Sequence, residues 1–304
     1  MIRKRLLTLV PTVLGVVTLV FAFLHLVPGD PVEVMLGETA RAADKTALRA
    51  ELGLDRPILE QYAGYLGGLL QGDLGHSFVH RRPVREVIAA RLPATLELAG
   101  WALVVAVALA FPLGVLAATR KDRFLDRASL VGSLLGVSMP NFWLGPLLIL
   151  LFSVKLGWFP VSGREGPAAV VLPAITLGTA LAALLSRMIR SSLVEVLGAE
   201  YLRAARARGV GERKIVWVHA LRNAGLPVIT VLGLQLGSLL SGAVITEAVF
   251  AWPGIGTLLL GAIQGRDYPL VQGCVLVISV GYVAANLLAD LLYRWADPRV
   301  RGAR

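Results

Sequence analysis

Long apolar stretches alternate along this chain with shorter polar and mostly basic segments. Six charge-free stretches are long enough for a helix to cross a lipid bilayer, which takes roughly 20 residues. They are Leu6–Val27, Leu98–Ala118, Ala128–Val154, Gly166–Ser186, Asn223–Thr246 and Pro269–Ala289. Their apolar residues are continuous rather than alternating, so they indicate helices, in which every backbone amide bonds internally. The pattern predicts an all-α integral membrane protein with six transmembrane helices in one domain, residues 1–304.

The basic residues between these stretches set the orientation. With the amino terminus inside, the cytoplasmic side receives the basic clusters in 3–5, 120–127, 187–222 and 294–304. Short basic loops face the cytoplasm, whereas long loops count little in this rule. We therefore expect both termini and the loop 195–222 to be cytoplasmic.

The first external region, Gly29–Pro93, is too long for a simple connection and more polar than the predicted spans. Asp55 stands where it would cap a helix, with Pro57 in the first turn. An apolar face then predicts a helix on the membrane or on another subunit, through Ile58, Tyr62, Leu66 and Leu69. We expect an extracytoplasmic helical region, 29–93, without chemistry of its own.

Two features complicate the spans. Ala248–Gly265 is apolar and uncharged, but it is short, and Pro253 would break a helix near its start. A seventh crossing would also move the C-terminal arginines outside, so we interpret this stretch as folded back or interfacial. Pro140 and Pro146 lie in the third span and predict a bend there.

The loop 195–222 carries an ordered helical pattern as well as charge. Tyr201, Ala204, Ala205 and Arg208 recur at helical spacing, and Gly209 then provides a left-handed cap. Glu212 begins a second helical run, where its charge suits the helix dipole. We predict two short helices joined by a tight glycine turn. Either a docking helix or a basic segment among anionic headgroups fits this pattern.

Composition narrows the function. The chain has 304 residues, is 56% hydrophobic and has mean hydropathy +0.71, values that place it among membrane proteins. Its net charge of +10 is confined to loops without base-stacking aromatics, which argues against nucleic-acid binding. No lysine follows a glycine, so the chain lacks the Gly-Lys-Ser/Thr of a P-loop.

Other candidate chemistry is sparse. Cys274 is the only cysteine, and His76 and His80 stand four apart without a metal-binding motif, so we predict no metal site. No nucleophile–base constellation appears, and we predict a chain that is not an enzyme and holds no cofactor. Four polar residues near or within spans are candidates for lining a pathway: Asn141, Gln235, Glu247 and Asn286. For Glu247, a capped, water-facing carboxylate is the alternative interpretation.

The segment EYLRAARARG, followed by HALRNAGLP, resembles the EAA loop of ABC-importer permeases, most closely the dipeptide/oligopeptide (peptide/nickel/opine) branch. Arg203 stands where the general pattern has glutamate, and Pro227 lies further from Gly209 than usual; both features are similar to that branch. The resemblance extends along the chain through VPGDP, LGLD, GDLG, TLEL, PVSGR and RDYP.

The resemblance implies a type I ABC-importer permease fold in the bacterial cytoplasmic (inner) membrane. It assigns coupling to the ATPase to Glu200, Tyr201, Arg203, Ala204, Ala205, Arg208 and Gly209. It implies a second homologous permease subunit, two cytoplasmic ABC ATPase subunits that carry ATP and Mg²⁺, and an extracytoplasmic peptide-binding protein. Dipeptides or short oligopeptides are the expected cargo. Nickel chelates or glutathione are alternative cargoes, and an ion-coupled secondary carrier or, least of all, a membrane enzyme are alternative classes.

Overall fold

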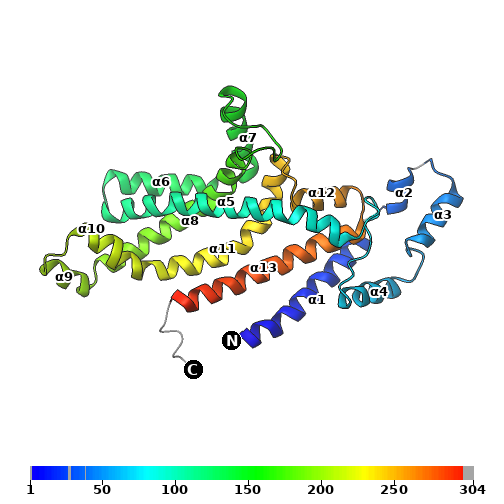
Figure 1. The fold of residues 1–304 in the computed structure, drawn as a ribbon, viewed down its shortest axis with the longest axis horizontal. Coiled ribbons are helices and arrows are strands. Elements are labelled where there is room, and N and C mark those ends of the chain that lie inside the picture. Colours follow the sequence, from blue (N-terminus) through cyan, green and yellow to red (C-terminus); the bar gives the residue numbers. More distant parts are fainter. Residues whose placement is uncertain (1, 27–28, 38, 297–304) are drawn as a thin grey trace. The chain divides into compact units, whose positions relative to one another are not determined.

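A computed structural model describes residues 2–26, 29–37 and 39–296 (Figure 1). Within these ranges the regular secondary structure is helical, apart from an isolated β-bridge between His76 and Pro83. The chain forms two compact units, one made of Met1–Thr95 with Pro253–Gly281 and the other of Leu96–Trp252 with Tyr282–Arg304. Two helices, α5 (Val84–Thr119) and α13 (Tyr268–Ala296), each contribute their first part to the first unit and their second part to the second.

The first unit combines both ends of the sequence. It contains α1 (Ile2–Leu26), α2 (Pro31–Leu36), α3 (Ala42–Glu51), α4 (Ile58–Leu70) and α12 (Ile255–Gln264), with the first parts of α5 and α13. Its apolar core joins α5, α12 and α13 through Val84, Val87, Ile88, Ile255, Leu258, Ala262, Leu270, Val271 and Cys274. Val20 and Leu24 of α1 pack against this cluster.

A buried carboxylate fastens the loop before α5 to the base of α13. Asp267 is fully buried and accepts hydrogen bonds from the Ser77 hydroxyl and from the backbone N–H groups of Phe78 (3.1 Å) and Val79 (3.2 Å). It also accepts one from the N–H of Leu270 in the first turn of α13, at 3.3 Å. These donors satisfy an acidic group that would be costly to bury alone.

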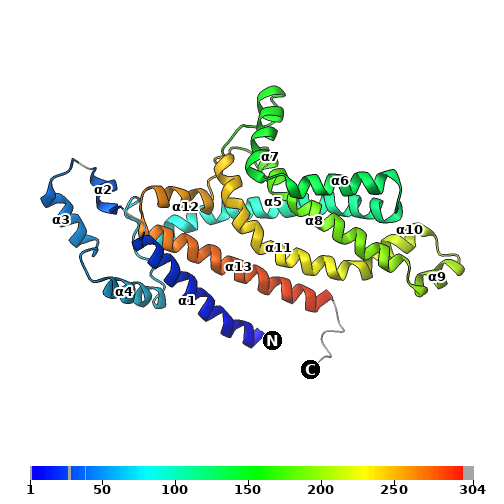
Figure 2. The same ribbon diagram turned by 180° about the vertical axis from the view of Figure 1, so that it is seen from behind.

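The second unit holds α6 (Phe124–Ser138), α7 (Asn141–Leu148), η1 (Ile149–Lys155), α8 (Val171–Leu197), α9 (Glu200–Ala207), α10 (Glu212–Lys214), η2 (Ile215–Ala220) and α11 (Leu221–Val249). Helix α8 is its centre and packs on α6, α7 and α11 (Figures 1 and 2). Glycine allows closer contact with α5, because a Cβ on Gly178 would lie 2.6 Å from the Ala102 carbonyl oxygen.

The helices extend beyond several predicted spans. Helix α5 begins at Val84, well before Leu98, and α8 runs on to Leu197 instead of ending near Ser186. By length and composition, three described helices could cross a membrane, or five if each of two bent pairs is one span. The apolar part of α1 and the whole of α12 fall below that length. The count of six spans stays a prediction.

Two local expectations change and a third is met. The predicted bend in the third span is a break between α6 and α7: the helical segments 126–136 and 141–155 lie 103° apart, because Pro140 follows an extended Met139. Asp55 does not cap α4, which begins at Ile58 with Pro57 as its N-cap residue. As expected, the 248–265 stretch has a helix only after Pro253, the ten-residue α12, which is too short to span. Val27, Pro28, Arg299, Arg301 and Arg304, used in the sequence analysis, lie outside the described residues.

Candidate coupling surface

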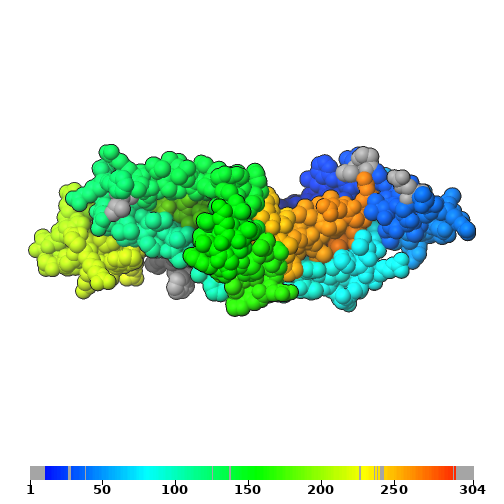
Figure 3. Space-filling view, turned by 90° about the horizontal axis from the view of Figure 1, so that it is seen from above, coloured from blue at the N-terminus to red at the C-terminus, as the bar shows by residue number. Residues whose placement is uncertain are grey.

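Helix α9 is held by one buried side chain and exposes most of the rest. Leu202 is fully buried where α9 packs on η2, whose Ile215 and Ala220 are also fully buried. Of the residues assigned to coupling, only Ala205 is half-buried, and the others are exposed: Glu200, Tyr201, Arg203, Ala204, Arg208 and Gly209. In the space-filling view the yellow-green surface of this segment forms one end of the second unit (Figure 3).

The turn after α9 requires glycine. Gly209 has φ +80°, its N–H donates to the Arg206 carbonyl (2.9 Å), and the Val210 N–H donates to the Ala205 carbonyl (3.2 Å). These two bonds form a Schellman motif, which satisfies carbonyls at the helix end. A Cβ at Gly209 would meet no atom within 4 Å, so the demand for glycine comes from backbone conformation and not from crowding. The predicted glycine cap is confirmed.

Polar contacts fasten α9 to its neighbours. The Arg206 guanidinium donates to Glu212 of α10 at 2.6 Å and to the Leu197 carbonyl at the end of α8 at 3.4 Å. The hydrogen bond to Glu212 raises the pKa of Arg206, which keeps this link charged. The Asn223 amide of α11 donates to the Tyr201 hydroxyl at 2.7 Å. Helix α9 is thus attached to the helices on both sides of it.

The second predicted short helix begins at Glu212 as expected and runs on into the fifth predicted span. The helical residues of α10, η2 and α11 follow one another without a gap, from Glu212 to Val249. No glycine or proline occurs between Glu212 and Ala224, but the run bends by 55° between 212–225 and 227–235, where Gly225 and Pro227 stand. The second predicted helix is therefore present but longer than expected, and a displacement of α10 would reach the fifth predicted span through this bend.

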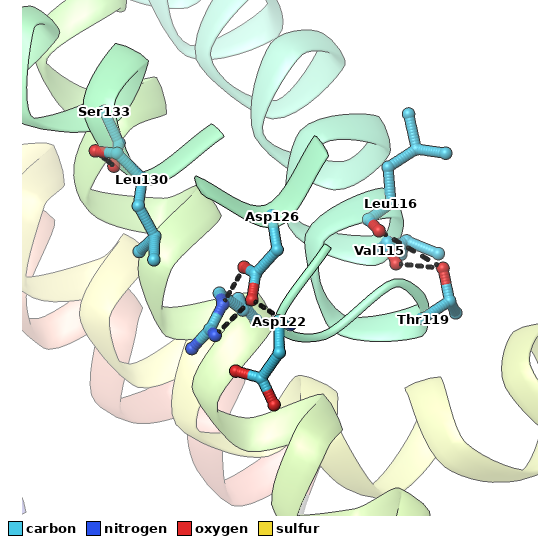
Figure 4. A network of polar contacts seen from close by, with 8 residues as sticks. Val115, Leu116, Thr119, Asp122, Asp126, Leu130 and Ser133 are labelled. Atoms are coloured by element: carbon cyan, nitrogen blue, oxygen red, sulfur yellow. Dashed lines mark hydrogen bonds and ion pairs between the residues drawn. The ribbon is translucent and has the colours of Figure 1, made fainter. Parts of the chain in front are cut away.

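An ion pair joins α8, which leads into α9, to the start of α6 (Figure 4). Arg190 of α8 donates through Nε and Nη2 to the two carboxylate oxygens of Asp126, at 2.5 and 2.7 Å. Asp126 is 1% exposed and also accepts the backbone N–H of Asp122 at 2.9 Å. This fork-shaped pairing fixes the relative orientation of the two helices.

This ion pair was not predicted from the sequence, where Arg190 counts only toward membrane orientation and Asp126 has no assigned role. The available signal was an acidic residue at the start of an apolar span, within the basic run 120–127. A carboxylate in that position needs a cation when the helices close around it.

The candidate pathway residues lie on three helices, α7, α11 and α13. Asn141 begins α7, Gln235 lies in α11 and Asn286 in α13, and all three are half-buried. Glu247, near the end of α11, is fully buried, so its interpretation as a water-facing carboxylate was wrong. A role in lining a pathway stays a prediction for all four.

Two families match nearly the whole chain. Residues 1–99 match the family described as "Binding-prot-dependent transport system membrane comp, N-term", and residues 110–302 match "Binding-protein-dependent transport system inner membrane component". The chain belongs to this family of ABC-importer permeases. The resemblance noted at the coupling loop is therefore confirmed along the chain.

Curated relatives cover this permease almost completely. The dipeptide transport system permease protein DppB of Escherichia coli (strain K12) is 45% identical over 332 aligned residues, covering 99% of this chain and 98% of the relative. The glutathione transport system permease protein GsiC of Salmonella typhimurium is 45% identical over 300 residues, with 99% and 98% covered. The chain is a multi-pass membrane component of a transporter rather than an enzyme.

Solved structures support the fold. The MetNI methionine ABC transporter in an inward-facing conformation matches with TM-score 0.57 and 20% identity, covering 70% of this permease and 97% of that chain. An amino acid ABC transporter with histidines matches with TM-score 0.51 and 15% identity, covering 71% and 94%. At this identity the likeness concerns the fold alone, which is that of an ABC-importer membrane subunit.

Proposed function

We propose that this permease is one of two membrane subunits of an ATP-driven importer of short peptides in the bacterial inner membrane. A second, related permease subunit pairs with it, two cytoplasmic ATPase subunits bind ATP and Mg²⁺, and an extracytoplasmic binding protein delivers the peptide. The strong similarity to a dipeptide permease supports the cargo. The absence of a Gly-Lys-Ser/Thr sequence supports an ATPase on separate subunits.

The observation that carries the proposal is the way in which α9 is attached to its neighbouring helices. Its exposed face carries two small side chains, Ala204 and Ala207, among larger and mostly charged ones. Helix α9 is fastened to α8 and α10 by Arg206, to η2 by Leu202 and to α11 by Tyr201. A short helix of this kind fits into a groove of a partner and transmits displacement without bending. Movement of the ATPases would shift α9 and, through the helical run from Glu212 with its 55° bend at Gly225–Pro227, tilt α11 within the membrane.

Two substitutions test this coupling. Ala205→Glu places a charged, longer side chain at the half-buried position beside the exposed face of α9, and Gly209→Pro requires φ near −65° where the backbone has +80°. We expect both variants to insert into the membrane with their partners and to lose ATP-dependent uptake of labelled trialanine into proteoliposomes. Ala43→Glu, at an exposed position of α3, is the matched control and should transport normally. Normal uptake by Ala205→Glu and Gly209→Pro would overturn the assignment.

Glutathione is the second candidate cargo, because a glutathione permease is equally similar to this chain. Purifying the complex with its binding protein and identifying the retained ligand by mass spectrometry distinguishes the two. A retained set of dipeptides and tripeptides supports the proposal, whereas glutathione alone supports the alternative.

A further inference from the structure

The first unit contains a cavity of about 730 Å³. Its walls come from α1, the segment from α3 to α4, the loop before α5 and the start of α13. Sites for small molecules commonly measure roughly 300–1,000 Å³, so this volume is sufficient for one. The sequence predicted a helical extracytoplasmic region here without a binding or catalytic site of its own.

One wall of the cavity carries a buried amide without a partner. Gln272 on α13 is 7% exposed and lines the cavity. Its side chain makes no hydrogen bond to any residue that the structure describes. A buried polar group left without a partner costs about 1–3 kcal/mol, so such groups generally meet water or a ligand. An amide side chain offers one acceptor and two donors, the complement of a peptide bond.

A second wall presents a strained arginine. Arg81 lines the cavity with φ +51°, a left-handed conformation that is uncommon outside glycine, asparagine and aspartate. The loop holds it there, because the Arg81 N–H donates to the Ser77 carbonyl at 2.9 Å and the Ser77 hydroxyl is anchored to buried Asp267. Strain of this kind in a fixed loop is typical of functional positions.

The remaining lining combines opposite charges with aromatic rings. The side chains of Arg56 and Arg81 form no ion pair within the described residues, and the same holds for Glu51 and Glu60. Phe21 and Tyr65 contribute a stacked aromatic pair with ring centroids 6.2 Å apart. Burial raises the pKa of Tyr65 to about 12, so its hydroxyl remains a donor. Cations, anions, an amide and aromatic surface thus surround one space.

We propose that this cavity binds a short zwitterionic peptide, with Arg81 at its carboxylate and Gln272 at a peptide bond, before the peptide enters the membrane-spanning path. The inference rests on the proposed function, since it specifies the chemistry of an external waiting site in a peptide importer. Arg56 supplies a second cation, and Glu51 and Glu60 offer partners for the terminal ammonium. Guanidinium and carboxylate pair through strong, directional hydrogen bonds.

The test measures equilibrium binding of radiolabelled trialanine to the complete permease–ATPase complex in nanodiscs, without binding protein. Arg81→Asn removes the guanidinium and tolerates the positive φ, and Gln272→Met removes the amide while keeping an unbranched side chain. Loss of a hydrogen bond to a charged group corresponds to roughly 10- to 100-fold weaker binding, the effect expected for Arg81→Asn. Gln272→Met should weaken binding by about 3- to 10-fold.

Two controls sharpen the result. Arg82→Asn changes the adjacent arginine, which pairs with Glu86 and does not line the cavity, and it should bind like the unmodified complex. Trialanine amide, which lacks the terminal carboxylate, should bind weakly to the unmodified complex and be insensitive to Arg81→Asn. Unchanged thermal midpoints would show that the variants are folded.

Absence of saturable binding by the unmodified complex overturns the inference, as does equal binding by all variants. A zwitterionic phospholipid that co-purifies with the complex and is lost in Arg81→Asn and Gln272→Met would identify a lipid site instead and also overturn it. ATP-driven uptake of trialanine with binding protein present is measured in parallel. If uptake persists without cavity binding, only this inference fails; if uptake fails in the unmodified importer, the proposed function fails.

Discussion

Removing Arg190 should destabilise the permease more than removing any other arginine of α8. In Arg190→Met the Asp126 carboxylate, 1% exposed in the unmodified chain, keeps the Asp122 N–H, 2.9 Å away, as its hydrogen-bond donor within the described residues, with Lys121 as the remaining nearby cation. Leaving one charge of a buried pair alone costs about 3–5 kcal/mol. That cost corresponds to a decrease of roughly 100- to several thousandfold in the ratio of folded to unfolded protein.

The effect depends on charge, so a second substitution should restore stability. Asn at 126 still accepts the Asp122 N–H but carries no charge. We therefore expect Asp126→Asn combined with Arg190→Met to recover at least half of the loss. Arg187→Met, three residues earlier on α8, is the matched control, since Arg187 forms no ion pair in the described part of the chain. It should change stability by about 0.5 kcal/mol or less.

The measurement is reversible denaturant unfolding of the purified complex in detergent, followed by helical circular dichroism. The expected order of midpoints is unmodified and Arg187→Met highest, the double variant next, and Arg190→Met lowest. If Arg190→Met and Arg187→Met unfold at the same denaturant midpoint, the ion pair does not hold α6 to α8. The same conclusion follows if adding Asp126→Asn to Arg190→Met does not raise the midpoint.

Two further predictions concern glycines. Gly209→Ala should weaken the capped turn by about 1–2 kcal/mol because an L-residue is strained at φ +80°, and the stimulation of ATPase activity by transported peptide should fall. The control is Gly211→Ala, at φ −64° and equally uncrowded, which should have a smaller effect. Equal effects of the two substitutions would contradict the explanation. Gly178→Ala should destabilise α5–α8 packing by about 1–3 kcal/mol, because its Cβ would lie 2.6 Å from the Ala102 carbonyl. Gly100→Ala is the control, because a Cβ added there has no atom within 4 Å. Both variants are compared by thermal unfolding, and a similar loss of stability in the two would refute the packing argument.

Hydropathy located the helices but not their ends. Apolar length identifies the part of α8 that fits in hydrocarbon, yet the helix continues to Leu197. Arg190 lies in this extension and is paired with Asp126, so its charge does not end the helix. The same reasoning missed the beginning of α5, where Val84, Val87 and Ile88 serve the core of the first unit rather than the membrane. Proline predicted a bend at position 140, and the extended Met139 before it makes that bend a break between α6 and α7.

Local chemistry near the coupling surface was more predictable than long-range contacts. Helical spacing and a terminal glycine are sufficient to predict α9 and its Schellman cap, because both depend on neighbouring residues. The contacts of Asp126 with Arg190 and of Ser77 with Asp267 join residues 64 and 190 positions apart. Sequence alone gives no register between such segments, and the cavity beside Gln272 depends on the same long-range packing.

The central claim is that α9 is cytoplasmic and receives movement from an ATPase. The accessibility of position 204 tests this claim most directly. The only native cysteine, Cys274, is fully buried, so Ala204→Cys in a Cys274→Ser background gives one exposed thiol. We predict that a membrane-impermeant maleimide labels it in inside-out vesicles only, and that bound ATPase subunits protect it. Labelling in sealed right-side-out vesicles would contradict the account.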